Sequence, residues 1–198
     1  SMHTYPMHDT HYNPDFWGVP DSEEGLSDLE KTEAAMLRAK GYAMSQYESV
    51  VSYMKSLGVN KPVHIGETGW STQSNERYGD EGSRACDEYK SAVYYKHLRE
   101  WTNAAGITCF YFEAFDEQWK DAANPGGSEN HFGLFNLQAQ AKYMIWDLVD
   151  AGVFKGLTRD GQPITKTFNG DKDAVMKTVK APPTTEETKR SEERRVGK

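Results

Sequence analysis

The segment that decides the fold is a short apolar run ending in a glutamate between two glycines: Pro62-Val63-His64-Ile65-Gly66-Glu67-Thr68-Gly69-Trp70-Ser71-Thr72. Val63 and Ile65 are β-branched residues that favour a buried strand. Gly66 and Gly69 let the backbone turn tightly where that strand ends. At this point Glu67 projects either into a site above a sheet or simply into solvent from a turn. The rest of the chain decides between these interpretations.

Composition excludes several classes of protein. The chain has 198 residues, enough for one domain with a sizeable core. With a net charge of -7 and no basic block, it is not expected to have nucleic acid as its main partner. No stretch is apolar enough to span a membrane, so no membrane partner is expected. No signal peptide is present, but the Ser1-Met2 start resembles an expression remnant, which leaves the compartment open.

Neither the cysteines nor the histidines predict a metal site or another cofactor. Cys86 lies in a helical pattern and Cys109 in a strand pattern, which favours two ordinary packed thiols. His8-Asp9-Thr10-His11 lacks a further ligand at fixed spacing, so residues lining a cleft are the preferred interpretation. Aromatic residues make up 12% of the chain. Aromatic faces beside acidic groups suit sugar rings, but they also suit an ordinary aromatic core.

The order of predicted elements is strand then helix, three times over. Strands are expected near 3–5, 63–66 and 107–115, and helices near 30–57, 83–105 and 139–151. This rhythm, with a repeat of roughly 45–60 residues, is typical of a parallel α/β sheet or barrel. The 107–115 run is nearly continuously apolar, as expected of a strand buried on both faces. Gly58 and Gly106 are predicted to end the first two helices.

The C-terminal part is expected to lie outside this α/β unit. Leu157-Thr158 and residues 164–167 predict a small strand pair around the turn Asp160-Gly161. Residues 181–198 are charged, carry prolines and lack large apolar groups, which predicts disorder. Arg190–Lys198 resembles a processing or cloning artefact rather than native protein. The expected divisions are a partial barrel (1–155), a small extension (156–180) and a disordered, non-native tail (181–198).

Residues that carry chemistry follow each predicted strand. Tyr5 follows the first, Glu67 and Trp70 follow the second, and 113–120 surround the end of the third. In a parallel α/β barrel the active site lies at the carboxyl ends of the strands. This convergence favours a functional role for Glu67 over an exposed turn.

Two separated motifs resemble family 17 of the glycoside hydrolases, the β-1,3-glucanases and glucanosyltransferases. Ile65–Ser71 resembles the family's nucleophile motif, a strand followed by Glu, a small residue, Gly and Trp. Phe115–Lys120, followed by Glu129–Phe135, is similar to its second hallmark. Thr4-Tyr5-Pro6 resembles the tyrosine-proline pair that closes an earlier strand. The resemblance covers about residues 3–150, and two motifs in the right order are far more specific than a lone Gly-Glu-x-Gly.

The resemblance implies an α/β fold of the (β/α)8 TIM-barrel type and a retaining hydrolysis of laminarin-like β-1,3-glucan. Glu67 attacks the anomeric carbon, and a second carboxylic acid about 5 Å away protonates the leaving oxygen and then activates water. Lys120 is a candidate for the cation that keeps Glu67 ionised. Glu117, Lys120 and Glu129 correspond to family residues that hold this end of the site together. A surface salt-bridge cluster is the alternative for these three.

Aromatic side chains near the motifs are candidates for contacts with the sugar. Tyr5, Trp70 and Trp119 can each stack on a glucose ring or pack against a neighbouring loop. Phe132 and Phe135 are expected in the core rather than at the ligand.

The chain departs from the family pattern in one respect. The family's acid/base glutamate follows the fourth strand in an Asn-Glu pair, and no such strand precedes Tyr5. Motif for motif, the chain corresponds to the last three β/α units of the barrel, strands six to eight. Glu113 is the obvious substitute for the missing acid, but it is predicted to lie within the third strand, before Phe115, rather than past its end.

We therefore expect an incomplete catalytic domain that is inactive alone and is completed by the missing N-terminal barrel half or by a second copy. A glucanosyltransferase is one alternative, since hydrolysis and transfer share the covalent intermediate and differ only in the acceptor. A non-catalytic glucan-binding or assembly module is the other. The parent protein is expected to be secreted, periplasmic or on the cell surface.

Overall fold

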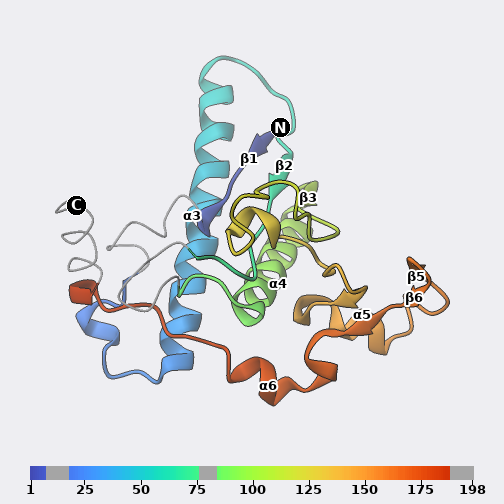
Figure 1. The fold of residues 1–198 in the computed structure, drawn as a ribbon. Coiled ribbons are helices and arrows are strands. Elements are labelled where there is room, and N and C mark those ends of the chain that lie inside the picture. Colours follow the sequence, from blue (N-terminus) through green and yellow to red (C-terminus); the bar gives the residue numbers. More distant parts are fainter. Residues whose placement is uncertain (8–17, 76–83, 188–198) are drawn as a thin grey trace.

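The chain folds around a three-stranded parallel sheet in the order β1-β2-β3, shown in Figure 1. This computed structural model describes residues 1–7, 18–75 and 84–187. The strands are β1 (Met2–His3), β2 (Ile65–Thr68) and β3 (Cys109–Tyr111). Ile65 is in register with Met2 on one side and with Cys109 on the other. The predicted parallel sheet is confirmed, and each of its first two strands is followed by a long helix.

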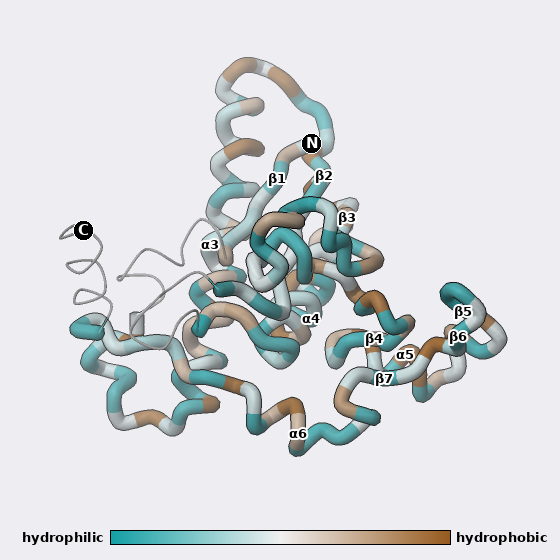
Figure 2. The backbone as a smooth tube through the Cα atoms, in the orientation of Figure 1, coloured by the Kyte–Doolittle hydropathy of each residue, from teal (hydrophilic) through white to brown (hydrophobic). Residues whose placement is uncertain are grey.

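Two helices, α3 (Asp28–Ser56) and α4 (Glu88–Ala105), pack on one face of this sheet. Their apolar stripes meet β2 in a shared core, which includes Ala35, Met36, Ala39, Ile65, Tyr94 and Leu98. Hydrophilic and hydrophobic positions alternate along α3 in Figure 2, and its buried residues, from Thr32 to Ala43, all lie in the N-terminal part of the helix. Both predicted helices are confirmed, although α4 begins later than residue 83.

The ends of both helices follow from local chemistry. Ser27 and Glu30 form a capping box at the start of α3, and the Asp87 side chain caps α4 by accepting a backbone N–H. Gly58 and Gly106 have φ values of +72° and +66°, the left-handed conformation that stops a helix. Both glycine stops were predicted correctly.

The face of the sheet opposite the helices is open. Strand β3 is shorter than the predicted 107–115 and is not buried on both faces. Cys109 and Tyr111 pack towards the helices, whereas Phe110 points the other way and is 64% exposed. His3 of β1 is exposed as well. The apolar run predicted a neighbouring layer on this face, and no element among the described residues supplies it.

The predicted helix over 139–151 is wrong in its first part. The segment begins with a short strand and a 3-10 turn, and only its end is α-helical: β4 (Gln140–Ala141), η3 (Tyr143–Ile145) and α5 (Trp146–Asp150). Ala139 has a φ of +59°, and Lys142 is extended, so the first turn of a helix cannot form there. The helical spacing of apolar residues arises because both a strand and a helix face the same small core.

The C-terminal extension contains the predicted hairpin in a shorter form. The remaining elements of the described chain are η1 (Asp21–Glu23), η2 (Ser128–Asn130), β5 (Thr158–Arg159), β6 (Gln162–Pro163), β7 (Thr165–Lys166), η4 (Thr167–Gly170) and α6 (Lys172–Met176). Strands β5 and β6 are antiparallel around Asp160 and Gly161, which both have positive φ. The expected second strand, 164–167, instead contributes β7, which pairs in parallel with β4. The extension is thus joined to the body by a strand ladder.

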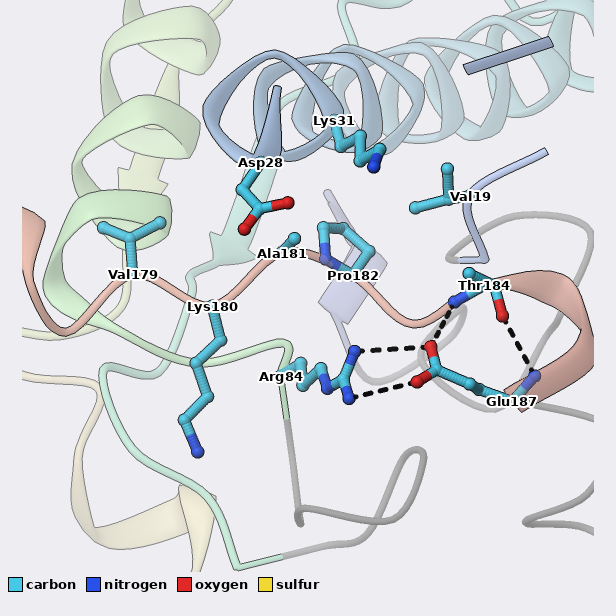
Figure 3. A pocket seen from close by; sticks show the side chains of 10 residues that line it. All are labelled: Val19, Asp28, Lys31, Arg84, Val179, Lys180, Ala181, Pro182, Thr184 and Glu187. Carbon is cyan, nitrogen blue, oxygen red and sulfur yellow. Dashed lines mark hydrogen bonds and ion pairs between the residues drawn. The ribbon is translucent and has the colours of Figure 1, made fainter. Parts of the chain in front are cut away.

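Disorder was predicted from residue 181 onward, but residues 181–187 are ordered. The Val19 amide donates to the Pro183 carbonyl over 2.8 Å. Arg84 forms an ion pair with Glu187 at 3.4 Å, and the Glu187 carboxylate also accepts from the Thr184 amide (Figure 3). Backbone pairing and this ion pair replace the large apolar side chains that the segment lacks. The rest of the predicted tail, 188–198, lies outside the described residues.

The structure tests the expectations about a metal site and a membrane span only for the residues that it describes. His8-Asp9-Thr10-His11 lies outside the described residues. In the part of the chain that the structure covers, no group of three or more His, Cys, Asp or Glu side chains is arranged to hold a metal ion. None of the described helices has the length and apolar character needed to cross a bilayer.

Candidate active site

Glu67 lies in β2, one residue before the strand ends, on the open face of the sheet. Its carboxylate Oε2 is 2.8 Å from the imidazole Nδ1 of His3, its register partner on β1. The Glu67 side chain is 31% exposed, so it is accessible from the open face. The structure therefore supports the interpretation of a carboxylate projecting above a sheet.

The glycines around Glu67 do not form the predicted tight turn. Strand β2 runs through Gly66 to Thr68, and neither Gly66 nor Gly69 has a positive φ. A Cβ atom on Gly69 would lie only 2.2 Å from the Phe112 carbonyl oxygen. Glycine is needed here because the backbones that follow β2 and β3 touch, which brings the two candidate motifs together.

Tyr5 is placed against Glu67, so two of the candidate site residues lie together. Burial, and then a hydrogen bond to the Glu67 carboxylate, raise the pKa of the Tyr5 hydroxyl above its ordinary value. The Tyr5 ring stands edge-on to Phe112 and Phe132, with centroids 6.2 and 5.7 Å away. Tyr5 is therefore a fixed hydrogen-bond donor to Glu67, and its ring is committed to packing.

Lys120 forms a charge cluster with two other glutamates. Its Nζ lies 2.8 Å from Oε2 of Glu113 and 3.3 Å from Oε2 of Glu117, and it sits 3.7 Å from the centre of the Phe112 ring. Among the described residues these are its ion pairs, so the expected contact between Lys120 and Glu67 is not formed. The groups that contact Glu67 come from the N-terminal segment instead: His3 of β1 and Tyr5 just after it.

Glu113 is the carboxylate that sequence reasoning placed wrongly. Because β3 ends at Tyr111, Glu113 follows the strand and does not lie within it. Its side chain is 12% exposed, and burial raises its pKa to about 7 against the opposing effect of Lys120. Its Oε1 has no hydrogen-bond partner in the described part of the chain. The only sequence feature that could have indicated a site role for Glu113 was its position as the single acidic residue in the apolar run 107–115.

The two candidate tryptophans lie in opposite environments. Trp70 is fully buried, donates its Nε1 proton to the Ala85 carbonyl over 2.9 Å and packs on Tyr94. It therefore has no free face for a sugar, and its expected stacking role is corrected to a core role. Trp119 is 73% exposed and keeps its ring available. Glu129, in η2, is exposed and acts electrostatically on the Tyr5 hydroxyl.

A buried lysine that the sequence gave no reason to select connects the loops of the site. Lys142 Nζ donates to Thr72 Oγ1 at 2.8 Å, to Asp116 Oδ1 at 2.7 Å and to the His131 carbonyl at 3.0 Å. Burial lowers the pKa of Lys142, and the Asp116 carboxylate opposes this effect. Thr72 follows the Glu67 motif, and Asp116 and His131 belong to the two parts of the second motif. Lys142 thus fixes the two motifs relative to each other.

A carboxylate at the end of a strand in a parallel sheet, with helices on one face and charged loops above it, is typical of barrel enzymes that cleave or transfer sugars. The chain belongs to the glycosyl hydrolases family 17, whose family model matches residues 44–146, just over half of the chain. Glu67, Glu113 and Lys120 all lie within the matched range.

Known relatives agree with this assignment. The chain is 65% identical to an endo-laminarinase from Formosa Hel1_33_131 of known crystal structure, with a TM-score of 0.88 over 93% of this chain and 47% of that one. It is 35% identical over 94 residues to a glucan 1,3-beta-glucosidase of Arthroderma benhamiae, covering 43% of this chain and 28% of the relative. Glucan endo-1,3-beta-glucosidase 8 of Arabidopsis thaliana is 32% identical over 122 residues, covering 57% of this chain and 23% of the relative.

The chain thus spans about half of the laminarinase and about a quarter of these two curated relatives. Its fold is part of a TIM-barrel-like architecture.

Proposed function

We propose that the chain is the C-terminal part of a retaining β-1,3-glucan hydrolase, with Glu67 as the nucleophile. The observation that carries this proposal is the placement of the Glu67 carboxylate on the open sheet face beside two hydrogen-bonding groups, His3 and Tyr5. Glu67 attacks the anomeric carbon while the bond to the leaving oxygen breaks, and water then releases the glycosyl group from the enzyme. The 65% identity to an endo-laminarinase supports β-1,3-glucan as the substrate.

His3 and Tyr5 orient the nucleophile. A carboxylate that accepts hydrogen bonds from two groups is held in one orientation. The same two groups can stabilise the negative charge that returns to Glu67 when the glycosyl-enzyme intermediate breaks down. Tyr5 is held rigidly by its edge-on contacts with Phe112 and Phe132. We assign both residues to positioning Glu67.

The sugar is held by groups on the loop that follows β3. Trp119 offers an exposed ring for stacking, while Glu117 and Glu129 offer carboxylate oxygens for sugar hydroxyls. Glu113 is mostly buried and paired with Lys120, so we assign it to fixing Lys120 and Glu117. The general acid in this proposal lies in the part of the parent barrel that this chain does not span.

The open face of the sheet is the surface that the other half of the barrel covers. Phe110 is 64% exposed there, and β1 and β3 are the two edges of the sheet. In this proposal the chain supplies the last three β/α units, strands six to eight. We expect it to be inactive until an N-terminal half or a second copy completes the site.

Complementation tests this proposal. The chain is co-expressed with the part of the Formosa laminarinase that it does not match, and reducing ends released from laminarin are measured. We expect turnover only in the assembled barrel, and its loss in Glu67→Gln but not in Glu100→Gln, a control at an exposed glutamate of α4.

Turnover by the isolated chain that is lost in Glu67→Gln would place the proton donor within this sequence and contradict the incomplete-site proposal. An active barrel unaffected by Glu67→Gln would contradict the assignment of the nucleophile. Products longer than the added oligosaccharide would favour a glucanosyltransferase. Glucan binding without turnover in the assembled barrel would favour a binding module.

A further inference from the structure

A cavity lies on the outer side of helices α3 and α4, away from the sheet. It has a volume of about 470 Å³, within the range of sites for small ligands. We call it the outer pocket, and the residues used below are Glu33 and Leu37 of α3, Tyr89, Lys96 and His97 of α4, and Tyr143 of η3. The buried residues of both helices face the sheet, and Glu33 and Leu37 are exposed on the opposite side.

Two tyrosines form an aromatic wall in this pocket. The rings of Tyr89 and Tyr143 are 27° from parallel, with centroids 6.4 Å apart. The Tyr89 hydroxyl donates to Glu33 Oε1 over 2.6 Å. Tyr143 is fixed by its amide, which donates to Glu88 Oε2 over 2.7 Å, and by an edge contact with Trp146. Fixed tyrosine faces suit the C–H face of a sugar ring at little entropic cost.

Polar groups stand beside this wall. The Nδ1 atom of His97 is buried and has no hydrogen-bond partner in the described part of the chain, which is uncommon for such an atom. Burial and the nearby charge of Lys40 lower the pKa of His97, so a neutral imidazole can donate to or accept from a hydroxyl. The Glu33 carboxylate and the Lys96 ammonium lie in the same lining. Lys172 of α6 also lines the pocket, so one carboxylate, two ammonium groups and the His97 imidazole offer hydrogen-bond acceptors and donors to the hydroxyls of a polyol.

The outer pocket is complete within this chain. Helices α3 and α4 contact each other directly, so no missing barrel unit lies between them. The lining comes mainly from the first halves of both helices. Because these helices run back from the carboxyl ends of the strands, their first halves lie at the same end of the barrel as Glu67. The pocket opens on the outer side of that end.

We propose that the outer pocket is a secondary carbohydrate site that binds a glucosyl unit of β-1,3-glucan. It holds one part of a polysaccharide molecule on the flank of the barrel while another part of the same molecule enters the site at Glu67. The identity of the sugar rests on the proposed function, whereas the stacking and hydrogen-bonding chemistry rests on the pocket itself.

Titration with laminaritriose tests the outer pocket separately from the site at Glu67. The isolated ¹⁵N-labelled chain is titrated to about 10 mM, and amide shifts of Ala92 and Val93 report on the outer pocket, while those of Trp119 report on the site at Glu67. We expect saturable shifts at Ala92 and Val93. Tyr89→Ala should weaken them by about tenfold or more, and Glu33→Gln should weaken them less.

Tyr53→Ala is the matched control, because Tyr53 is a 66% exposed tyrosine of α3 that does not line the pocket. Glu67→Gln should also leave the outer-pocket shifts unchanged. Shifts at Trp119 without shifts at Ala92 and Val93 would overturn this inference and leave the proposed function standing. Equal binding by Tyr89→Ala, Glu33→Gln and the unmodified chain would overturn it too. Outer-pocket binding in a completed barrel that does not turn over laminarin would contradict the proposed function alone.

Discussion

The Nδ1 atom of His3 lies 2.8 Å from Oε2 of Glu67, although the two residues are far apart in the sequence and come from different strands. They meet because β1 and β2 are parallel and His3 is in register with Glu67. Of the groups that approach the candidate nucleophile, His3 is the one that no motif indicated. It is the register partner of Glu67 on the open face, so only knowledge of the strand pairing could have selected it.

His3→Ala should reduce activity more than stability. The His3 side chain is 58% exposed, so its contact with Glu67 contributes no more than about 1 kcal/mol to the free energy of unfolding. Its loss leaves Glu67 less well oriented, which should lower kcat of the completed barrel by roughly tenfold. Laminarin kinetics and urea unfolding check both parts. A loss of stability with unchanged kcat would contradict the positioning role.

The two tryptophans should respond in opposite ways. Trp119→Ala should leave the free energy of unfolding within about 0.5 kcal/mol and weaken glucan binding at the Glu67 site, because the ring is 73% exposed. Trp70→Phe should cost roughly 1–3 kcal/mol, since it removes buried volume and the hydrogen bond from Nε1 to the Ala85 carbonyl. Urea unfolding and oligosaccharide titration of both variants measure this difference. Weaker binding in Trp70→Phe at full stability would restore the stacking role.

Lys142→Met should be among the most destabilising substitutions. It leaves the Asp116 carboxylate buried without its cation, at a cost of about 3–5 kcal/mol. Adding Asp116→Asn should recover part of this loss, because the uncompensated charge is then removed. Lys177→Met, at an exposed lysine just after α6, is the control and should change stability little. A fully additive double variant would show that the two residues are not coupled.

Glu113 should make stability depend on pH. Its pKa is raised to about 7 in the folded state, so the folded chain binds a proton more tightly than the unfolded chain. The resulting stabilisation is fully present below about pH 4.5 and is lost as pH rises through about 7, a change on the order of 3 kcal/mol. Glu113→Gln should remove this contribution to the change of the free energy of unfolding with pH. Urea unfolding at a series of pH values tests it, and identical slopes in both proteins would contradict the raised pKa.

Sequence patterns predicted the elements whose causes are local. Strand β2, both long helices and their glycine stops follow from β-branched residues, an apolar stripe and left-handed termini. The motif around Glu67 was recognised because its residues are contiguous. These features need no knowledge of the tertiary structure.

Features that depend on distant contacts were not predictable in the same way. The run over 107–115 suggested a long buried strand, and this concealed both the exposure of Phe110 and the position of Glu113 after the strand. Trp70 is part of the motif but points into the core, because a motif does not encode which side of the sheet each residue faces. Residues 181–187 lack large apolar groups and are ordered by backbone pairing with Val19, which composition does not reveal.

The uncovered sheet face also affects how this chain behaves in a concentrated solution. Among the described residues, β3 has no strand partner on its outer edge, and the ring of Phe110 beside that edge is 64% exposed. Such an edge is a template for edge-to-edge aggregation between chains. The yield of soluble isolated chain is therefore expected to be limited by self-association, which rises with concentration, even where each molecule is well folded.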